Sequence, residues 1–262
     1  MGPGVVSSPV PQTASAVEVN GLWKRFGEKV AVAGITLSVP RQSFFGLVGP
    51  NGAGKTTTIR MIVGLLRPDA GSSTIAGVSV WPDPQAAKEV IGVLPDDLRL
   101  FERLSGAEFL TYLGLMRGMN RDVVDRRRSD LLDVLGLTAD AGVLVADYST
   151  GMRKKIALAA ALLHAPHVLF LDEPFESVDP VSARGITEVL RTFRTRGGTV
   201  VFSSHVMDTV ERLCDHVAII AAGQVVRYGE INAVRGGRRL EDVFIDAVGV
   251  TPTSGANLDW LQ

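Results

Sequence analysis

Residues 49–56 read Gly49-Pro50-Asn51-Gly52-Ala53-Gly54-Lys55-Thr56, and the rest of the chain is best understood around them. Three glycines let the backbone curl so that successive N–H groups can point at phosphate oxygens. A helix that starts directly after such a loop adds the positive end of its dipole. The spacing predicts that Lys55 reaches the β- and γ-phosphates of a nucleotide and that the Thr56 hydroxyl binds Mg²⁺. We expect all eight residues, and Thr57 after them, to contact the nucleotide.

The sequence on both sides of this loop predicts an α/β fold. Residues 44–48 form an unbroken apolar run, which is typical of a strand buried on both faces, and helical spacing follows from Thr56 to Pro68. Apolar runs at 168–171, 199–202 and 216–220 predict further buried strands, the last two parallel, while 17–19 and 35–39 alternate like strands at a sheet edge. Between them, residues 97–165 are rich in helical patterns and predict an inserted helical subdomain.

Composition excludes several other classes of protein. The chain has 262 residues, 46% of them hydrophobic, and 27 basic residues against 28 acidic ones. That balance argues against a protein that coats nucleic acid, and the single cysteine, Cys214, cannot form a disulfide framework. No uncharged apolar stretch is long enough to span a membrane. We expect residues 1–16 to be a disordered tail and the basic run Arg153-Lys154-Lys155 to lie on a solvated helix face.

Two acidic residues and a histidine are the candidates for chemistry. Asp172 and Glu173 end the strand at 168–171, which we expect to lie beside the loop at 49–56. There Asp172 would bind Mg²⁺ and Glu173 would polarise a water molecule next to the γ-phosphate. His205 follows the strand at 199–202, where an imidazole can hydrogen-bond the same phosphate. These three residues favour a nucleotide-hydrolysing site.

In their order along the chain, these motifs resemble the nucleotide-binding subunit of an ABC transporter, from about Val17 to Phe244. The resemblance implies a P-loop NTPase core with an antiparallel β subdomain and the inserted helical subdomain. It implies an ATP-binding domain over residues 17–231, with the helical subdomain at about 97–165, followed by a C-terminal helical extension and tail at 232–262. The segment 240–244, read Leu-Glu-Asp-Val-Phe, is similar to exporter-type members with one cassette per chain.

The resemblance also implies roles for residues outside the loop. Phe26 stands where the family stacks an aromatic ring on adenine. Ser149, Thr150 and Gly151 occupy the position of the signature motif, and Asp179 belongs to a segment that resembles the D-loop. In a head-to-tail dimer, Ser149 and Gly151 of one subunit would close on the ATP held by the loop of the other.

Three positions depart from the family pattern. Asp96 stands where the family usually has a glutamine that contacts Mg²⁺ and the attacking water. A carboxylate can still bind Mg²⁺, but it adds charge and cannot donate a hydrogen bond. In the signature motif, Thr150 replaces a glycine and Met152 a glutamine, and Tyr148 stands where leucine is usual. We expect Asp96 to keep its role near the metal and the water.

The resulting expectation is an ATPase, with ATP and Mg²⁺ as its cofactors, that powers an exporter through separate transmembrane permease subunits. Its other partner would be a second nucleotide-binding subunit, identical or different, and its place the cytoplasmic face of the membrane. Residues 98–115 would be where the membrane partner docks. Two alternatives stay open, an ABC-type ATPase acting on ribosomes or nucleic acid and a regulatory cassette with weak hydrolysis. We expect no nucleic acid, because there is one cassette and no sustained heptad repeat.

Overall fold

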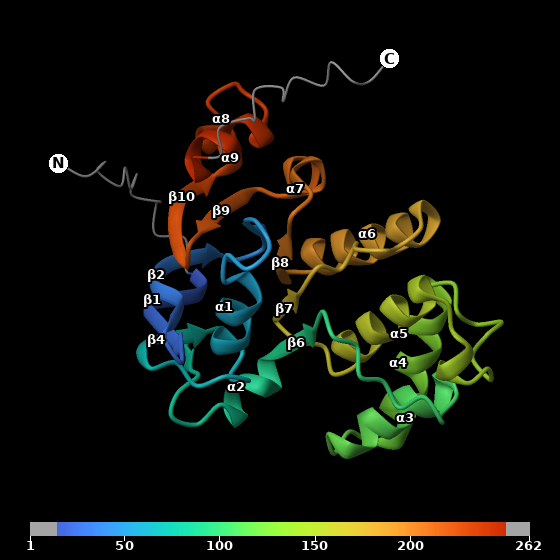
Figure 1. Ribbon diagram of the computed structural model, residues 1–262. Helices are drawn as coiled ribbons and strands as arrows, with labels where there is room; N and C mark the ends of the chain where they lie inside the picture. Colours follow the sequence, from blue (N-terminus) through green and yellow to red (C-terminus); the bar gives the residue numbers. More distant parts are fainter. Residues whose placement is uncertain (1–14, 250–262) are drawn as a thin grey trace, which may run out of the picture.

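A computed structural model of the chain describes residues 15–249 and contains two β-sheets with helices packed around them (Figure 1). The smaller sheet is antiparallel. Its strands, in the order β2-β1-β4-β5, are β1 (Ser15–Phe26), β2 (Lys29–Pro40), β4 (Ala70–Ile75) and β5 (Val78–Ser79). The antiparallel subdomain that the resemblance implied is therefore present, next to helix α1 (Lys55–Ile62).

The larger sheet supplies the strand ends that carry the acidic residues and the histidine. Its strands, in the order β10-β9-β3-β8-β7-β6, are β3 (Phe44–Val48), β6 (Ile91–Leu94), β7 (Val168–Leu171), β8 (Thr199–Ser204), β9 (His216–Ala221) and β10 (Gln224–Glu230). All neighbours pair in parallel except β9 and β10. The buried parallel strands predicted from the apolar runs are confirmed.

The strand that ends at Asp172 and the strand that leads into the loop are not direct neighbours. Strand β8 pairs in parallel with both β7 and β3 and separates them. All six residues of β8 are buried, so this strand suits a central position better than an edge. Asp172 still reaches the loop side of the sheet through Ser203 of β8, whose hydroxyl donates a hydrogen bond of 2.5 Å to Asp172 Oδ1.

Hydrophobic side chains fill both faces of the larger sheet. Phe45 and Phe170 belong to the cluster shared with α1 and the antiparallel sheet, and Phe202 belongs to the cluster shared with the helical region. The helix predicted to run to Pro68 ends earlier, at Ile62. Gly64, with a φ of 74°, then turns the backbone out of the helical conformation.

The helical region lies at one side of the larger sheet (Figure 1). It contains α3 (Gly106–Met116), α4 (Arg121–Val134), the 3₁₀ helix η1 (Val145–Asp147) and α5 (Thr150–Leu162). Ser105 and Glu108 form a capping box at the start of α3, and Asn120 caps α4. We propose residues 97–165 as the limits of this subdomain.

The remaining helices surround the sheet and follow its last strands. They are α2 (Gln85–Val90), α6 (Pro180–Thr195), α7 (Met207–Leu213), α8 (Ile231–Arg235) and α9 (Leu240–Val248). Glu211 of α7 fixes the last two, because it pairs with Arg235 at 2.6 Å and accepts a hydrogen bond from the Leu240 backbone N–H at 2.9 Å. We propose residues 232–262 as a C-terminal extension, of which 250–262 lie outside the described residues.

The predicted N-terminal tail needs a correction of two residues. Residues 1–14 lie outside the described part of the chain, but Ser15 and Ala16 belong to β1. Ser15 pairs with Pro40, and the Ala16 carbonyl accepts a hydrogen bond from the Ala76 N–H at 2.7 Å. Of the helices between residues 15 and 249, none has the length and apolar character needed to cross a membrane.

Candidate nucleotide-binding site

The loop at residues 49–56 has the conformation that its glycines predict. Gly54 has a φ of 103°, and a Cβ atom there would press against the carbonyl oxygen of Ala31. A Cβ atom at Gly49 would meet the carbonyl oxygen of Ile220 in β9. The loop is therefore packed so closely on its neighbours that both positions require glycine. Gly54 is also the N-cap of α1, and no side chain caps this helix. Its first N–H groups can therefore serve a ligand.

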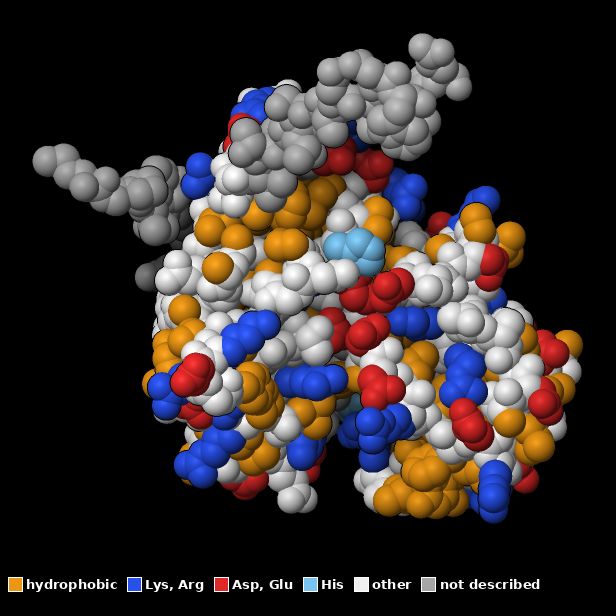
Figure 2. All heavy atoms as spheres, viewed as in Figure 1, with side chains coloured by type: hydrophobic (Ala, Val, Ile, Leu, Met, Phe, Trp, Pro, Cys, Tyr) orange, Lys and Arg blue, Asp and Glu red, His pale blue; other side chains and the backbone are white. Residues whose placement is uncertain are grey.

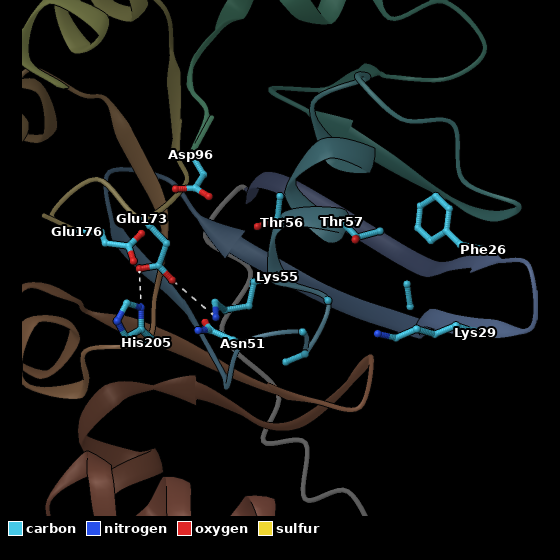
Figure 3. A pocket seen from close by; sticks show the side chains of 14 residues that line it. Phe26, Lys29, Asn51, Lys55, Thr56, Thr57, Asp96, Glu173, Glu176 and His205 are labelled. Atoms are coloured by element: carbon cyan, nitrogen blue, oxygen red, sulfur yellow. Dashed lines mark hydrogen bonds and ion pairs between the residues drawn. The ribbon is translucent and has the colours of Figure 1, made fainter. Parts of the chain in front are cut away.

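Lys55 is folded back into the loop. Its side chain is 7% exposed, and its Nζ donates hydrogen bonds to the carbonyl oxygens of Gly49 at 2.7 Å and Pro50 at 3.3 Å. The same Nζ lies 3.6 Å from Glu173 Oε1 (Figure 3). Lys55 thus connects the loop with the end of β7, and a phosphate would compete with Glu173 for this ammonium group.

A cavity of about 490 Å³ opens over the loop and collects most of the predicted residues. Figure 3 shows Asp96, Glu173 and His205 on one side of Lys55, and Phe26 on the other. The cavity is lined by Phe26, Lys29, Ala31, Asn51, Gly52, Ala53, Gly54, Lys55, Thr56, Thr57, Asp96, Glu173, Glu176 and His205. Of the other predicted residues, Gly49, Pro50, Asp172, Ser149, Thr150, Gly151 and Asp179 do not line it.

Glu173 is held from several directions at the end of β7. Its φ of 47° lies in the left-handed region, which is strained for a residue with a side chain. Its backbone N–H donates to Ser203 Oγ at 2.9 Å, and its Oε2 lies 3.1 Å from His205 Nδ1. The carboxylate is 12% exposed, so it lies between the loop lysine and the histidine with limited access to solvent. This arrangement can hold a water molecule next to a bound phosphate and accept its proton.

The residues predicted to hold Mg²⁺ come from three elements. Thr56 lies in the first turn of α1, Asp172 follows β7 and is buried, and Asp96 lies two residues beyond β6. Asp172 Oδ1 is engaged by Ser203, which leaves Oδ2 for a ligand. A hydroxyl and one or two carboxylates, completed by phosphate oxygens, are the ligands that Mg²⁺ prefers. The donor set fits this ion.

Phe26 lies at the end of β1, just before the turn to β2, and forms the outer wall of the cavity. Its side chain is half exposed, although large aromatic residues are usually buried. The Nζ of Lys24 lies 5.7 Å from the ring centre. An exposed ring over a phosphate-binding loop offers a flat surface for a purine base.

The signature residues do not line this cavity. Ser149 caps α5 by accepting a hydrogen bond from the Met152 N–H at 3.3 Å, and both Ser149 and Thr150 are exposed. Gly151 is buried, since a Cβ atom there would lie 2.8 Å from Ser182 Oγ and 2.9 Å from Asp179 Oδ2. The start of α5 is thus packed against the start of α6, outside the lining of the cavity of its own chain.

Tyr148, which replaces the usual leucine, has a structural explanation. It is buried, and its hydroxyl donates a hydrogen bond of 2.8 Å to the carbonyl oxygen of Asp140. Gly106 makes room for this hydroxyl, because a Cβ atom there would collide with it. The burial and a neighbouring Asp140 raise the pKa of Tyr148.

Asp179 caps α6 rather than facing the cavity of its own chain. Its Oδ1 accepts hydrogen bonds from the N–H groups of Val181 and Ser182, both at 3.0 Å. These bonds, above all the one from Ser182, lower the pKa of Asp179. Its predicted role at a nucleotide stays a prediction about the site of a partner subunit.

Sequence reasoning missed four residues near the cavity. Lys29 starts β2 just after the turn that follows Phe26, and Ala31 comes two residues later. Glu176 lies three residues after Glu173, and Ser203 is a polar residue inside a buried apolar strand. The last of these carried a readable signal, because a buried hydroxyl needs a hydrogen-bond partner.

Comparisons with known proteins agree with this geometry. The family model described as "ABC transporter" matches residues 32–176. The linearmycin resistance ATP-binding protein LnrL of Bacillus subtilis is 37% identical over 213 residues, which cover 81% of this chain and 68% of the relative. The Nod factor export ATP-binding protein I of Ralstonia nicotianae is 36% identical over 229 residues, covering 87% and 70%.

A solved structure has the same fold. The ATP-binding subunit of an ABC transporter superposes with a TM-score of 0.83 at 28% identity, and the match covers 89% of this chain and 99% of the solved one. The expected P-loop fold with its α/β architecture is confirmed. By its loop, its sheet order and these relatives, the chain belongs to the ABC transporter family as an ATP-binding, ATP-hydrolysing subunit.

Proposed function

We propose that this chain powers an exporter, with Glu173 as the base that activates water. The observation that carries the proposal is the placement of the Glu173 carboxylate between Lys55 and His205 in the lining of the cavity. Relatives named for linearmycin resistance and Nod factor export support the direction of transport. The transported substance would be bound by another subunit, so its identity is left open.

The residues in and next to the cavity would have different roles in ATP binding and hydrolysis. The Lys55 ammonium and the N–H groups of the loop residues other than Pro50, which has no N–H, would bind the phosphates, and Phe26 would stack on the adenine. Thr56, Asp172 and Asp96 would hold Mg²⁺, which neutralises charge on the phosphates when bound. Glu173 would take a proton from the attacking water, and His205 would hydrogen-bond the γ-phosphate and Glu173.

A second subunit would complete the site. Ser149, Thr150 and Gly151 lie at the start of α5 and, with Asp179, outside the chain's own cavity. A capped helix start with exposed Ser149 and Thr150 suits an anion from another molecule. We therefore propose a head-to-tail dimer in which these residues and Asp179 contact the ATP of the partner, with either an identical or a different second cassette.

The helical region would contact the membrane partner. Figure 2 shows hydrophobic side chains gathered over α3 at the lower edge of the molecule. The exposed ones there include Phe101, Tyr112, Leu115 and Met116, with Met116 67% exposed. Phe101 and Tyr112 pack edge to face at 5.2 Å. An apolar patch of this kind is typical of a protein contact, and we propose that a transmembrane permease subunit covers it at the cytoplasmic face of the membrane.

The decisive experiment compares ATP turnover by the purified wild-type chain and Glu173→Gln. We expect hydrolysis to fall at least 100-fold while ATP-dependent dimerisation, measured by size-exclusion chromatography with light scattering, remains. Glu176→Gln is the matched control, because it removes an equal charge from the same cavity, and it should keep activity within about threefold. Equal turnover in the wild type and Glu173→Gln would overturn the role of Glu173.

The partner is tested by affinity purification from detergent-solubilised membranes. We expect a protein with several apolar spans to co-purify with the wild-type chain and to be lost with Tyr112→Ser/Met116→Ser. Val134→Ser changes an exposed apolar residue of α4 in the same region and serves as the control. Recovery of ribosomes without a membrane protein would contradict the proposed partner.

A further inference from the structure

Lys154 does not have the environment that its sequence suggested. We expected the basic run at residues 153–155 to lie on a solvated face, and this is wrong for its middle member: Lys154 is 5% exposed. The side chain lies in α5, five residues after Ser149, the N-cap of that helix. A buried ammonium group must be paired, because burial without a partner costs several kcal/mol.

Its partner is the backbone of the catalytic glutamate. Lys154 Nζ donates a hydrogen bond of 2.9 Å to the carbonyl oxygen of Glu173. The N–H of the same residue donates to Ser203 Oγ at 2.9 Å. The peptide groups on the two sides of Glu173 are therefore held by different elements, β8 on one side and α5 on the other.

Glu173 needs such support because its backbone is strained. A φ of 47° persists in a residue with a side chain only when surrounding contacts hold it there. Within residues 15–249, this carbonyl accepts only one other hydrogen bond, from the Glu176 N–H three residues along the same loop, at a longer 3.2 Å. Lys154 thus ties the Glu173 carbonyl to the helical region, as Ser203 ties the Glu173 N–H to β8.

The side chains around Lys154 carry negative charge, which complements its ammonium group. Burial lowers its pKa, whereas the carboxylates of Asp96, Glu176, Asp172 and Glu173 raise it. Asp96 is the largest of these charge effects and stands where the family usually has an uncharged glutamine. The ammonium group of Lys154 therefore balances part of the negative charge that Asp96 adds to this end of the sheet.

We propose that Lys154 is a positioning residue for ATP hydrolysis, which holds the Glu173 peptide so that its carboxylate faces the attacking water. The proposal rests on the proposed role of Glu173. Lys154 lies about 7.5 Å along the helix axis from Ser149, the residue that would meet the ATP of the partner subunit. In the proposed dimer, the first turn of α5 would therefore contact the ATP of the partner subunit. Its second turn would position Glu173, the base for the ATP of its own subunit.

The test is steady-state ATP hydrolysis by the full chain with Lys154→Met, which keeps the apolar stem and removes the donor. We expect kcat to fall about 10- to 100-fold, the range for a displaced base, while KM for ATP changes less than threefold. Lys154→Arg, which retains charged N–H donors, should recover at least a third of the wild-type kcat. A merely structural role would not separate kcat from KM or be restored by arginine.

The matched control is Lys155→Met, one position along the same helix. Lys155 makes no hydrogen bond or ion pair that the structure records within residues 15–249, so kcat should stay within about twofold of the wild type. A loss as large as that of Lys154→Met would mean a general effect of charge or helix stability and would overturn the proposal. So would an unchanged kcat in folded Lys154→Met.

Testing Lys154→Met in a Glu173→Gln background distinguishes a failure of this proposal from a failure of the proposed function. In Glu173→Gln, Lys154→Met should leave ATP-dependent dimerisation unchanged, because the lysine acts on the base rather than on nucleotide binding. Loss of dimerisation would overturn the proposal without affecting the role of Glu173. Should Lys154→Met fail to fold by circular dichroism, Lys154→Gln, whose amide is too short to reach the carbonyl, takes its place. The same kcat loss is expected, and near wild-type kcat would refute the positioning role.

Discussion

The nucleotide cavity and the helical region differ in how far their functional side chains are exposed and in whether the chain itself pairs them. Lys55 and Glu173 line the cavity and Asp172 lies next to Glu173, and all three are little exposed and engaged by groups of the same chain. In the helical region, Ser149 and Thr150 are exposed at the start of α5, and apolar side chains such as Met116 face solvent. The first region is built as a site that can bind a ligand by itself. The second presents surfaces that other molecules would complete.

The difference follows from how each region is assembled. The cavity is made from the ends of parallel strands, which place Asp96, Glu173 and His205 at one edge of the sheet. Three α-helices, the 3₁₀ helix η1 and the loops between them form the other region, and its buried residues hold them together. Lys154 and His164 join the two regions, since one donates to Glu173 and the other contacts Ile91 of β6.

The largest effect should come from the loop itself. Gly54→Ala puts a methyl group against the Ala31 carbonyl at a φ of 103°, so the loop must change shape. We expect ATP affinity, measured by isothermal titration calorimetry, to fall about 100-fold or more, which is about 2.7 kcal/mol. The helical region should stay folded in Gly54→Ala, so that only nucleotide binding is lost.

Gly52→Ala is the control for that substitution. Gly52 also has a positive φ, 79°, but nothing lies within 4 Å of its Cβ position. Only the backbone strain applies, so the loss of affinity should be about fivefold. Equal losses at both positions would show that strain, rather than the contact with Ala31, decides the shape of the loop.

A smaller effect is expected in the helical region, where Gly106 and Tyr148 fit together. Gly106→Ala places a methyl group against the Tyr148 hydroxyl and should lower the free energy of unfolding by about 2 kcal/mol. In a Tyr148→Phe background the same change should cost less than about 1 kcal/mol, because the colliding oxygen is gone. Urea denaturation of the four proteins measures this cycle, and additive costs would exclude a direct contact as the cause.

Much of the fold could be predicted because its signals are local. The structure can be predicted from the local sequence alone for the loop at 49–56 and for the apolar runs at 44–48, 168–171 and 199–202. Helix α6 was not predicted although it has 16 residues and an amphipathic pattern that starts at Pro180. The order of β3, β8 and β7 could not be read from the sequence, since all three strands have similar apolar runs.

The site was predictable to a similar extent. Residues within a motif, such as Lys55 and Glu173, could be predicted because their spacing is typical of a nucleotide-binding site. Lys154 was misjudged because a basic run looks solvated in sequence, and only the packing of α5 against the end of β7 shows which of three neighbouring cations is buried. Contacts between elements distant in sequence leave no local pattern, so the supporting residues of a site are the hardest to foresee.

The smallest predicted effect concerns His164, where the two regions meet. Its Nε2 lies 2.8 Å from the Ile91 carbonyl oxygen, and its Nδ1 is buried without a hydrogen-bond partner within the described residues. Burial, together with the positive charges of Arg117 and Arg127, lowers the pKa of His164 from 6.5 to about 4. The unfolded chain therefore binds more protons than the folded one between these two values, and stability should fall as the pH drops from about 6.5 towards 4.

His164→Gln should remove this part of the pH dependence, because glutamine keeps a donor for Ile91 and does not titrate. The ring is only partly buried, so solvent screening limits the expected difference to about 1 kcal/mol between pH 7 and pH 5. Urea denaturation of both proteins at the two pH values measures it. A parallel loss of stability in both would show that protonation of other groups governs the acid sensitivity. A steeper loss in the wild type would show that the contact between His164, two residues after α5, and Ile91 of β6 depends on a neutral imidazole.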